Sequence, residues 1–340
     1  MGPGPVGYAA ACASGVTAGQ LRAAIDAGVV MRVRRGIVID TASWAAGSSG
    51  DRRRWALEAA LQAFPGSFGS HETAARLHRL PDYRMDPLTD PPSTHITVTG
   101  AARREGWLTV HGCDTPRIHV SEVDELAVTD LVRTSIEVAA TRSLRSAVVF
   151  VDAAMRREVG LTVGGWGLRE AVLEPDRRLA LRQQWRVALR PYARHRWVTR
   201  VREAVEMADP GSESVLESLS RVAVVEWGLP VPRCGVPVQG DDGRTYWADM
   251  VWDDARVIGE ADGLSKYDGV EAVLAEKRRQ EALEGRGWTF ARWGMAEVLP
   301  DSSVMAARIR RAFDLSTRPQ MSRNRDLGPG FTTFGVASAG

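Results

Sequence analysis

The chain has 340 residues, a formal net charge of +2 and a hydrophobic content of 44%. This length predicts two domains, or three small ones, and the composition is that of a globular protein with packed cores. No segment approaches the run of about eighteen apolar residues that a membrane helix needs, and residues 1–10 lack the basic start of a secretory signal. The three cysteines are far apart and form no disulfide framework or zinc spacing. We therefore expect a cytoplasmic protein without a membrane partner.

Residues 5–42 predict a small winged helix-turn-helix unit. After a short helix over 8–13, Thr17 caps a second helix and Gln20 completes a capping box. The alternating segment that follows predicts a hairpin with its turn at Arg35 and Gly36. In such units the second helix enters the major groove of DNA and the hairpin touches the backbone. The residues expected to contact DNA are Gln20, Arg22, Arg32, Arg34 and Arg35.

Residues 41–52 are small and polar and predict a connector to an α+β middle domain over 52–205. In this domain we expect helices over 71–80, 126–141 and 144–159, and strands over 93–100, 107–112 and 116–123. His71 and His78 lie seven residues apart, but two histidines without a third ligand are typical of ordinary packing or surface positions. The sequence therefore predicts no active site in the middle domain.

An arginine-rich segment closes the middle domain. Between residues 177 and 202 there are nine arginines and no acidic residue, and several of the arginines recur every four residues along one helical face. This stripe is either a face that is solvated or docked against acidic groups elsewhere in the chain, or a track for DNA phosphates. In the second case its DNA contacts are Arg182, Arg186 and Arg190.

The segment Asp209-Pro210-Gly211 predicts a break, after which a third domain occupies residues 210–315. Its pattern predicts the succession helix, strand, strand, strand, helix, strand, helix, and residues 316–340 read as a disordered tail. The first helix carries Glu213 and Glu217 on one face. Glu217 also stands three residues after Ser214, so a capping box is an equal alternative to a catalytic role.

Three carboxylates gather on the predicted strands of this domain. If residues 253–256 form a loop, the antiparallel register sets Asp249 opposite Glu260, and Asp262 shares the face of Glu260. Carboxylates this close need a cation or retained protons, and oxygen ligands suit Mg²⁺ or Mn²⁺. We therefore expect a metal site at Asp249, Glu260 and Asp262 that hydrolyses phosphodiesters, with Glu217 nearby. The chain's two lysines, Lys266 and Lys277, follow these acids and would supply the positive charge.

Several blocks of this domain carry a resemblance. The segments ESVLESLSR, GLPVPR, YWADMVW, GEADGLSKY and EKRRQEALEGRGW resemble, in order, the DUF559-type domain of actinobacterial proteins. That resemblance implies the restriction-endonuclease-like PD-(D/E)xK fold of the very-short-patch-repair endonucleases. It matches Glu217, Asp249 and Glu260 to the family's acids, whereas Asp262 stands where the family's lysine is expected.

The first two domains carry a second resemblance. VTAGQLRAAIDAGVVMRVRRGIVID and SHETAARLHRLP are similar to the AbiEi-type antitoxins, which join a winged helix-turn-helix to an α+β domain. Two functions stay open: a Mg²⁺- or Mn²⁺-dependent endonuclease on double-stranded DNA, or a non-catalytic antitoxin-like regulator with a degenerate nuclease fold. The second implies a homodimer and a toxin or defence-system partner.

Overall fold

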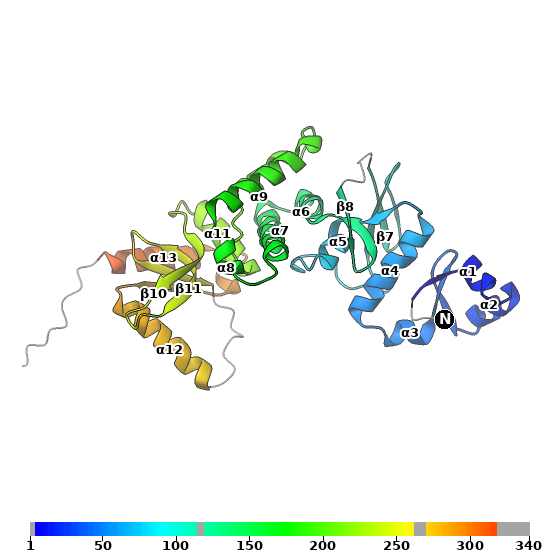
Figure 1. Ribbon diagram of the computed structural model, residues 1–340, viewed down its shortest axis with the longest axis horizontal. Helices are drawn as coiled ribbons and strands as arrows, with labels where there is room; N and C mark the ends of the chain where they lie inside the picture. The colour runs from blue at the N-terminus through cyan, green and yellow to red at the C-terminus, as the bar shows by residue number, and fades with distance from the viewer. Residues whose placement is uncertain (1–3, 114–118, 262–269, 318–340) are drawn as a thin grey trace, which may run out of the picture.

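The computed structural model describes residues 4–113, 119–261 and 270–317 (Figure 1). Within these residues the chain is a mixed α+β protein with three separate sheets, of three, six and four strands, in line with the α+β class that the sequence predicts. The sheets follow one another along the long axis of the molecule, with a helical region between the second and third (Figure 1). Among the described residues, every helix is too short or too polar to span a bilayer.

The N-terminal module, residues 4–40, is a small helix-and-sheet unit. The Thr17 side chain accepts a hydrogen bond from the Gln20 amide, and the Gln20 side chain accepts one from the Thr17 amide, which confirms the capping box. Leu21 packs between the helices and the strands with Ala11 and Val38. The expected hairpin forms, with a bulge in its first strand. The elements are β1 (Val6–Gly7), α1 (Tyr8–Ala13), α2 (Ala18–Asp26), β2 (Val30–Arg34) and β3 (Ile37–Asp40), with sheet order β1-β3-β2.

The connector predicted over 41–52 is wrong, because these residues are mostly helical. They form α3 (Thr41–Ala46) and begin α4 (Ser49–Ala63). Two of the small polar residues that suggested a loop, Ser48 and Asp51, form the capping box of α4, and Asp40, just before the segment, caps α3 by accepting from the Ser43 amide. Trp44 is buried against Trp55, with ring centroids 6.0 Å apart, and this contact fixes α3 on α4.

The second sheet forms the first half of the middle region. Its strands are β4 (Phe68–Gly69), β5 (Thr94–Val98), β6 (Arg103–Glu105), β7 (Leu108–Gly112), β8 (Val120–Val123) and β9 (Leu126–Thr129), in the order β6-β7-β5-β4-β9-β8. Helix α4 covers it through Leu57. The helix expected over 71–80 forms as α5 (His71–Leu77), after β4, a strand that the sequence did not predict.

The helix predicted over 126–141 is partly wrong. Asp124 and Glu125 both have positive φ, which closes a tight turn and pairs Val123 with Leu126 in a β8–β9 hairpin. Asp130 then caps α6 (Leu131–Ala140), so the helix begins five residues later than its apolar pattern predicts. Short apolar runs do not separate a strand from a buried helix by periodicity alone.

Helices form the rest of the middle region. They are α6, α7 (Leu144–Val163), α8 (Leu168–Ala171), α9 (Pro175–Ala188), the short 3₁₀ turn η2 (Arg190–Tyr192) and α10 (Val198–Met207). Phe150 of α7, Trp185 of α9 and Val201 of α10 are fully buried in one core. The indole of Trp185 donates to the Ser135 hydroxyl at 3.0 Å, which ties α9 to α6.

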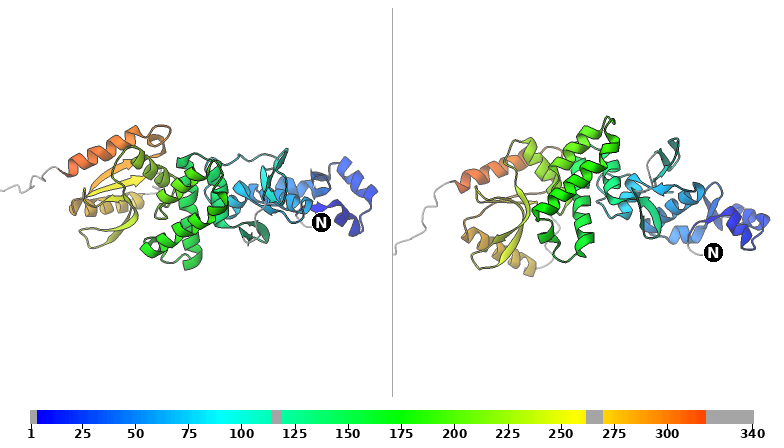
Figure 2. Two further views of the ribbon diagram at one scale, coloured as in Figure 1. Left: turned by 90° about the horizontal axis from the view of Figure 1, so that it is seen from above. Right: turned by 45° about the horizontal axis from the view of Figure 1, so that its top comes forward.

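The C-terminal unit has the predicted succession of elements. These are α11 (Val215–Glu226), β10 (Arg233–Gln239), β11 (Thr245–Trp252), β12 (Val257–Ala261), α12 (Val270–Gly285), β13 (Thr289–Trp293), the 3₁₀ turn η3 (Met295–Glu297) and α13 (Ser303–Ser316). Strands β10, β11 and β12 are antiparallel neighbours, and β13 joins β12 in parallel after the α12 crossover. Helices α11 and α13 cover one face of this sheet and α12 the other, as Figure 2 shows.

The break at 209–211 ends α10 but does not separate the units. Helix α11 packs on α7, and a buried ion pair joins Arg221 to Asp152 at 2.6 Å. Both side chains are less than 5% exposed, so the helical region and the C-terminal sheet share a continuous interior here. Asp262 and Lys266, and the expected tail from residue 318 on, lie outside the described residues.

Candidate functional site

Asp249 and Glu260 lie on neighbouring strands, with the register that the sequence predicts. Met250 pairs with Gly259, so the next step along the β11–β12 ladder sets Asp249 against Glu260. One carboxylate oxygen of Asp249 accepts a hydrogen bond from the Ala261 amide at 2.9 Å. This bond holds the Asp249 carboxylate beside Ala261, the last residue of β12.

Glu217 approaches this strand end from α11 and also closes the helix cap. Its carboxylate accepts from the Ser214 hydroxyl and from the Glu213 amide, each at 2.7 Å, and the Ser214 hydroxyl accepts from the Glu217 amide. Ser214 therefore caps the helix, but the return bond comes from Glu213 and not from the Ser214 amide that a capping box requires. Glu217 is 5% exposed. Burial raises the pKa of its carboxyl to about 7, and the negative charge of Asp249 adds to the rise. Glu213 forms ion pairs with Arg156 and Arg169, and its negative charge also contributes to the raised pKa of Glu217.

Two arginines hold the Glu260 carboxylate. Arg279 of α12 approaches one oxygen at 2.5 Å, and Arg292 of β13 approaches the other at 2.7 Å. Both guanidinium groups also contact Glu276, at 3.2 and 2.7 Å. We call Arg279 and Arg292 the arginine clamp. Because Glu260 is 7% exposed, the hydrogen bond from Arg292 and the ion pair with Arg279 offset the cost of burying its charge.

Of the two lysines that the sequence offers for the positive charge of this site, the structure describes only Lys277, and it places this side chain away from the Glu260 carboxylate. Lys277 projects to solvent from α12, with 72% of its side chain exposed, and its ion-pair partner is Glu281 at 3.8 Å. The reason is helical phase: Glu276 and Arg279, three residues apart, share the face that meets the sheet, and Lys277 is turned away from it. The positive charges beside Glu260 come from two arginines, Arg279 of α12 and Arg292 of β13, and not from Lys277.

The described carboxylates do not fit the expected Mg²⁺ or Mn²⁺ site in this arrangement. Both oxygens of Glu260 face guanidinium groups, and one oxygen of Asp249 is bonded to a backbone amide. A hard cation needs carboxylate oxygens that turn toward one point, and two guanidinium charges beside Glu260 oppose a third positive charge. The third expected ligand, Asp262, is outside the described residues.

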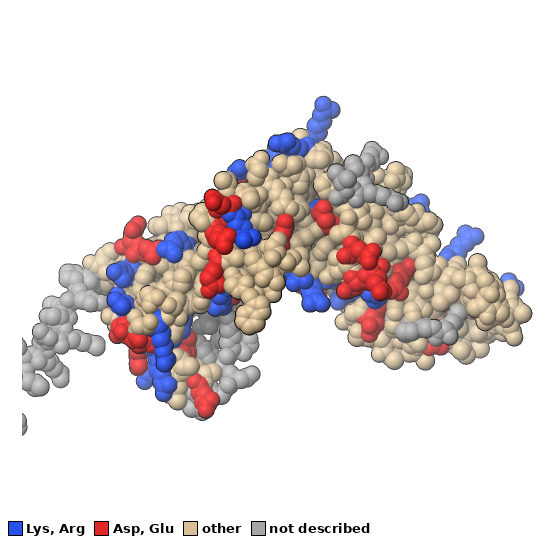
Figure 3. Space-filling view, viewed as in Figure 1, with Lys and Arg blue, Asp and Glu red and all other residues tan. Residues whose placement is uncertain are grey.

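The predicted DNA contacts of the N-terminal module divide into two groups. Arg34 is engaged inside the protein: it pairs with Glu105 at 2.6 Å and its guanidinium stacks on Phe64. Arg22, Arg32 and Arg35 are exposed, and none of them forms an ion pair with any residue that the structure describes. Gln20 is also exposed, although its amide oxygen serves the cap of α2. Figure 3 shows basic side chains projecting from the region of α1 and α2.

The arginine stripe is largely docked against the chain itself. Arg182 donates to the Ala208 carbonyl at 3.1 Å, and Arg186 forms a two-bond pair with Glu206 of α10. Arg190 is exposed, on the short turn that follows α9. Of the two interpretations that the sequence left open, docking therefore accounts for Arg182 and Arg186.

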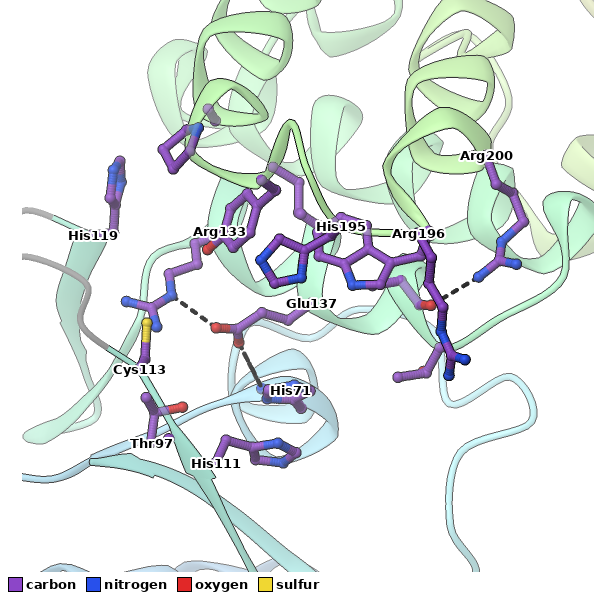
Figure 4. A pocket seen from close by; sticks show the side chains of 18 residues that line it. His71, Thr97, His111, Cys113, His119, Arg133, Glu137, His195, Arg196 and Arg200 are labelled. Carbon is purple, nitrogen blue, oxygen red and sulfur yellow. Dashed lines mark hydrogen bonds and ion pairs between the residues drawn. The ribbon is translucent and has the colours of Figure 1, made fainter. Parts of the chain in front are cut away.

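A large pocket in the middle region was missed by sequence reasoning. It lies between β5 and β7 on one side and α6, η2 and α10 on the other, and its volume is about 1100 Å³ (Figure 4). Four histidines line it: His71, His111, His119 and His195. The sequence carries one signal of this pocket, since five of the six histidines of the chain fall between residues 71 and 119.

A buried carboxylate stands in the middle of this pocket. Glu137 of α6 accepts from the Nε of Arg133 at 2.7 Å and from the amide of His71 at 3.1 Å. His71 stacks on His111 with ring centroids 3.5 Å apart. Burial lowers the pKa of both imidazoles to about 3, so the two rings are neutral at physiological pH. His71 also has a positive φ of 50°, which non-glycine residues seldom adopt.

The chain is similar in sequence to two proteins that are described as uncharacterized. No protein-family model matches the chain. Two uncharacterized proteins of Mycobacterium tuberculosis, one from strain CDC 1551 and one from strain H37Rv, are each 31% identical to it over 119 residues. The match covers 35% of this chain and 44% of each relative, so the chain spans less than half the length of the curated relatives it matches.

Proposed function

We propose that this protein binds duplex DNA through its N-terminal module and does not cut it, as an antitoxin-like regulator would. The observation that carries the proposal is the arginine clamp on Glu260. In a metal-dependent nuclease this carboxylate would share a cation with Asp249, whereas here Arg279 and Arg292 neutralise it from both sides. In this proposal the C-terminal domain contributes to DNA binding or joins two copies of the chain in a dimer, and it catalyses no reaction.

The exposed arginines of the N-terminal module support the DNA-binding part of the proposal. Arg22, Arg32 and Arg35 keep an uncompensated positive charge among the described residues, whereas Arg182 and Arg186 already meet acceptors of the chain. Phosphate binding depends on cations that can release condensed counterions from DNA. The N-terminal module is therefore a better candidate than the arginine stripe. The resemblance to AbiEi-type antitoxins favours the same module and makes a toxin or defence-system partner part of the proposal.

Metal-dependent hydrolysis remains a competing proposal with one observation in its favour. Glu217 and Asp249 are close enough for the charge of one to raise the pKa of the other, and a cation would relieve this repulsion. It requires the arginine clamp to release Glu260.

Salt-dependent binding tests the DNA-binding proposal. Affinity for a labelled random-sequence duplex is measured by fluorescence anisotropy in EDTA over a range of salt concentrations. The double variant Arg32→Ala/Arg35→Ala should weaken binding and reduce the slope of log K against log salt by about two, one for each lost phosphate contact. The matched control is Arg311→Ala, an exposed arginine of α13 at the opposite end of the molecule. An unchanged slope in the double variant would exclude the hairpin as the DNA contact.

A further inference from the structure

The pocket between the second sheet and the helices has the size of a small-molecule site. Its volume of about 1100 Å³ is at or above the upper end of the range typical of such sites, and far above what an ion or a few waters need. Strands β5 and β7 form one wall and α6, η2 and α10 the other, as Figure 4 shows. The two walls therefore come from segments that are far apart in the sequence, the strands near residues 97–112 and the helices between residues 133 and 200.

Three polar groups that line this pocket are buried and have no hydrogen-bond partner among the described residues. They are the Nη1 of Arg133, the hydroxyl of Thr97 and the Nε of Arg200. Arg133 and Thr97 are only 3% and 1% exposed. Buried polar atoms in native proteins nearly always have a partner, so this set is where a bound ligand or ordered water would find hydrogen bonds.

The charged side chains around the cavity indicate which sign of charge the ligand carries. Three guanidinium groups line it, those of Arg133, Arg196 and Arg200, against the single carboxylate of Glu137. His71 and His111 add no charge at neutral pH, because burial holds their pKa values at about 3. Arg133 is paired with Glu137 through Nε, so its Nη1 still points a donor at the cavity. The pocket is therefore suited to an anion, and guanidinium groups match carboxylate and phosphate geometry.

An aromatic cluster forms the wall beside these arginines. Tyr192, His195 and Trp197 line the pocket, with ring centroids between 5.2 and 5.6 Å from one another. Planar groups pack favourably on such rings, and Ile136 and Pro191 add apolar surface. One side of the cavity is thus suited to a charged group and the other to a flat ring.

We propose that this pocket binds a small organic anion that carries an aromatic ring. Its carboxylate or phosphate would accept hydrogen bonds from Arg133 and Thr97, and its ring would lie against Tyr192 and Trp197. This site is separate from the carboxylates of the C-terminal sheet and from the N-terminal module, so it does not depend on the DNA-binding proposal.

Calorimetry on the full chain tests the site with four probes. Adenosine monophosphate and salicylate carry the ring together with a phosphate or a carboxylate, whereas adenosine lacks the charge and inorganic phosphate lacks the ring. We expect saturable binding of at least one of the first two, and tighter binding than of either control. The stronger of the two identifies the anionic group. If neither adenosine monophosphate nor salicylate saturates the protein below ~10 mM, which is a very weak affinity for such a pocket, the proposal is overturned.

Two variants locate the binding. Arg196→Ala removes an exposed guanidinium that lines the pocket, and should weaken the anionic probe about threefold, because one of the three positive charges around the cavity is lost while the contacts with Arg133 and Thr97 stay. Its matched control is Arg194→Ala, an exposed arginine two residues away that is not part of the lining, and it should leave the affinity unchanged. Thr97→Val keeps the shape of a buried residue and should weaken the anionic probe without lowering Tm, because it removes a hydroxyl that has no partner in the described structure. Equal losses in the two arginine variants, or full affinity of the anionic probe in Thr97→Val, would contradict the proposed site.

Discussion

The raised pKa of Glu217 makes a specific prediction about stability and pH. Its pKa is about 7 in the folded protein, against an ordinary value of 4.5. Between pH 4.5 and pH 7, therefore, the Glu217 carboxyl keeps its proton in the folded protein and loses it in the unfolded chain. The stabilisation is complete below about pH 4.5 and is lost as the pH rises through 7, because the buried carboxylate must then ionise beside Asp249. The difference in pKa corresponds to a penalty of about 3 kcal/mol at alkaline pH.

Glu217→Gln isolates this penalty. The carbonyl oxygen of a glutamine can still accept from the Glu213 amide, and its NH2 group can donate to the Ser214 hydroxyl in place of the bond that the hydroxyl now donates. The glutamine side chain cannot ionise. We expect a free energy of unfolding close to wild type at pH 5 and higher by up to about 3 kcal/mol at pH 8.5, measured by urea unfolding at both values.

A control on the same helix separates this effect from a general loss of charge. Glu226 stands at the C-terminal end of α11, is partly exposed and pairs with Arg145. Glu226→Gln should change stability by less than about 1 kcal/mol at either pH. If Glu217→Gln destabilises the protein equally at pH 5 and pH 8.5, the carboxylate is held in its charged form and the reasoning is refuted.

Two further predictions concern buried ion pairs, and urea unfolding measures both. Arg279→Met leaves the buried Glu260 with one clamp residue and should cost about 2 kcal/mol or more, whereas Lys277→Ala on the exposed side of the same helix should stay within about 0.5 kcal/mol. Arg221→Met leaves Asp152 buried without its cation and should cost about 3–5 kcal/mol, while Arg186→Ala, which breaks an exposed pair, should cost less than about 1 kcal/mol. If the two variants of either pair lose the same free energy of unfolding, burial of the ion pair does not determine its contribution to stability.

Local chemistry explains the elements that could be predicted from the sequence. The capping box of Thr17 and Gln20 depends on residues three apart, and the Asp249–Glu260 register depends only on the short loop between two strands. The order of helices and strands in the C-terminal unit likewise follows from periodicity. These features are fixed by neighbours in the chain.

Long-range pairing explains what could not be predicted. Arg34 meets Glu105, which is 71 residues away, so its exposure could not be judged from the alternation of the hairpin. The arginine clamp depends on the parallel pairing of β12 with β13, where Glu260 lies beside Arg292. The pocket combines strands, helices and a 3₁₀ turn from residues 71 to 200, and no local spacing joins Thr97 to Arg133.

A plasmid assay tests the central claim, DNA binding without cleavage, most directly. Supercoiled plasmid is incubated with Mn²⁺ and enough protein to shift all of it on a gel, and the protein is then removed before a second gel. The account predicts a complete shift on the first gel and intact supercoiled plasmid on the second. Nicked or linear plasmid that disappears with Asp249→Ala would contradict it and would assign the cleavage to the carboxylates of the C-terminal sheet.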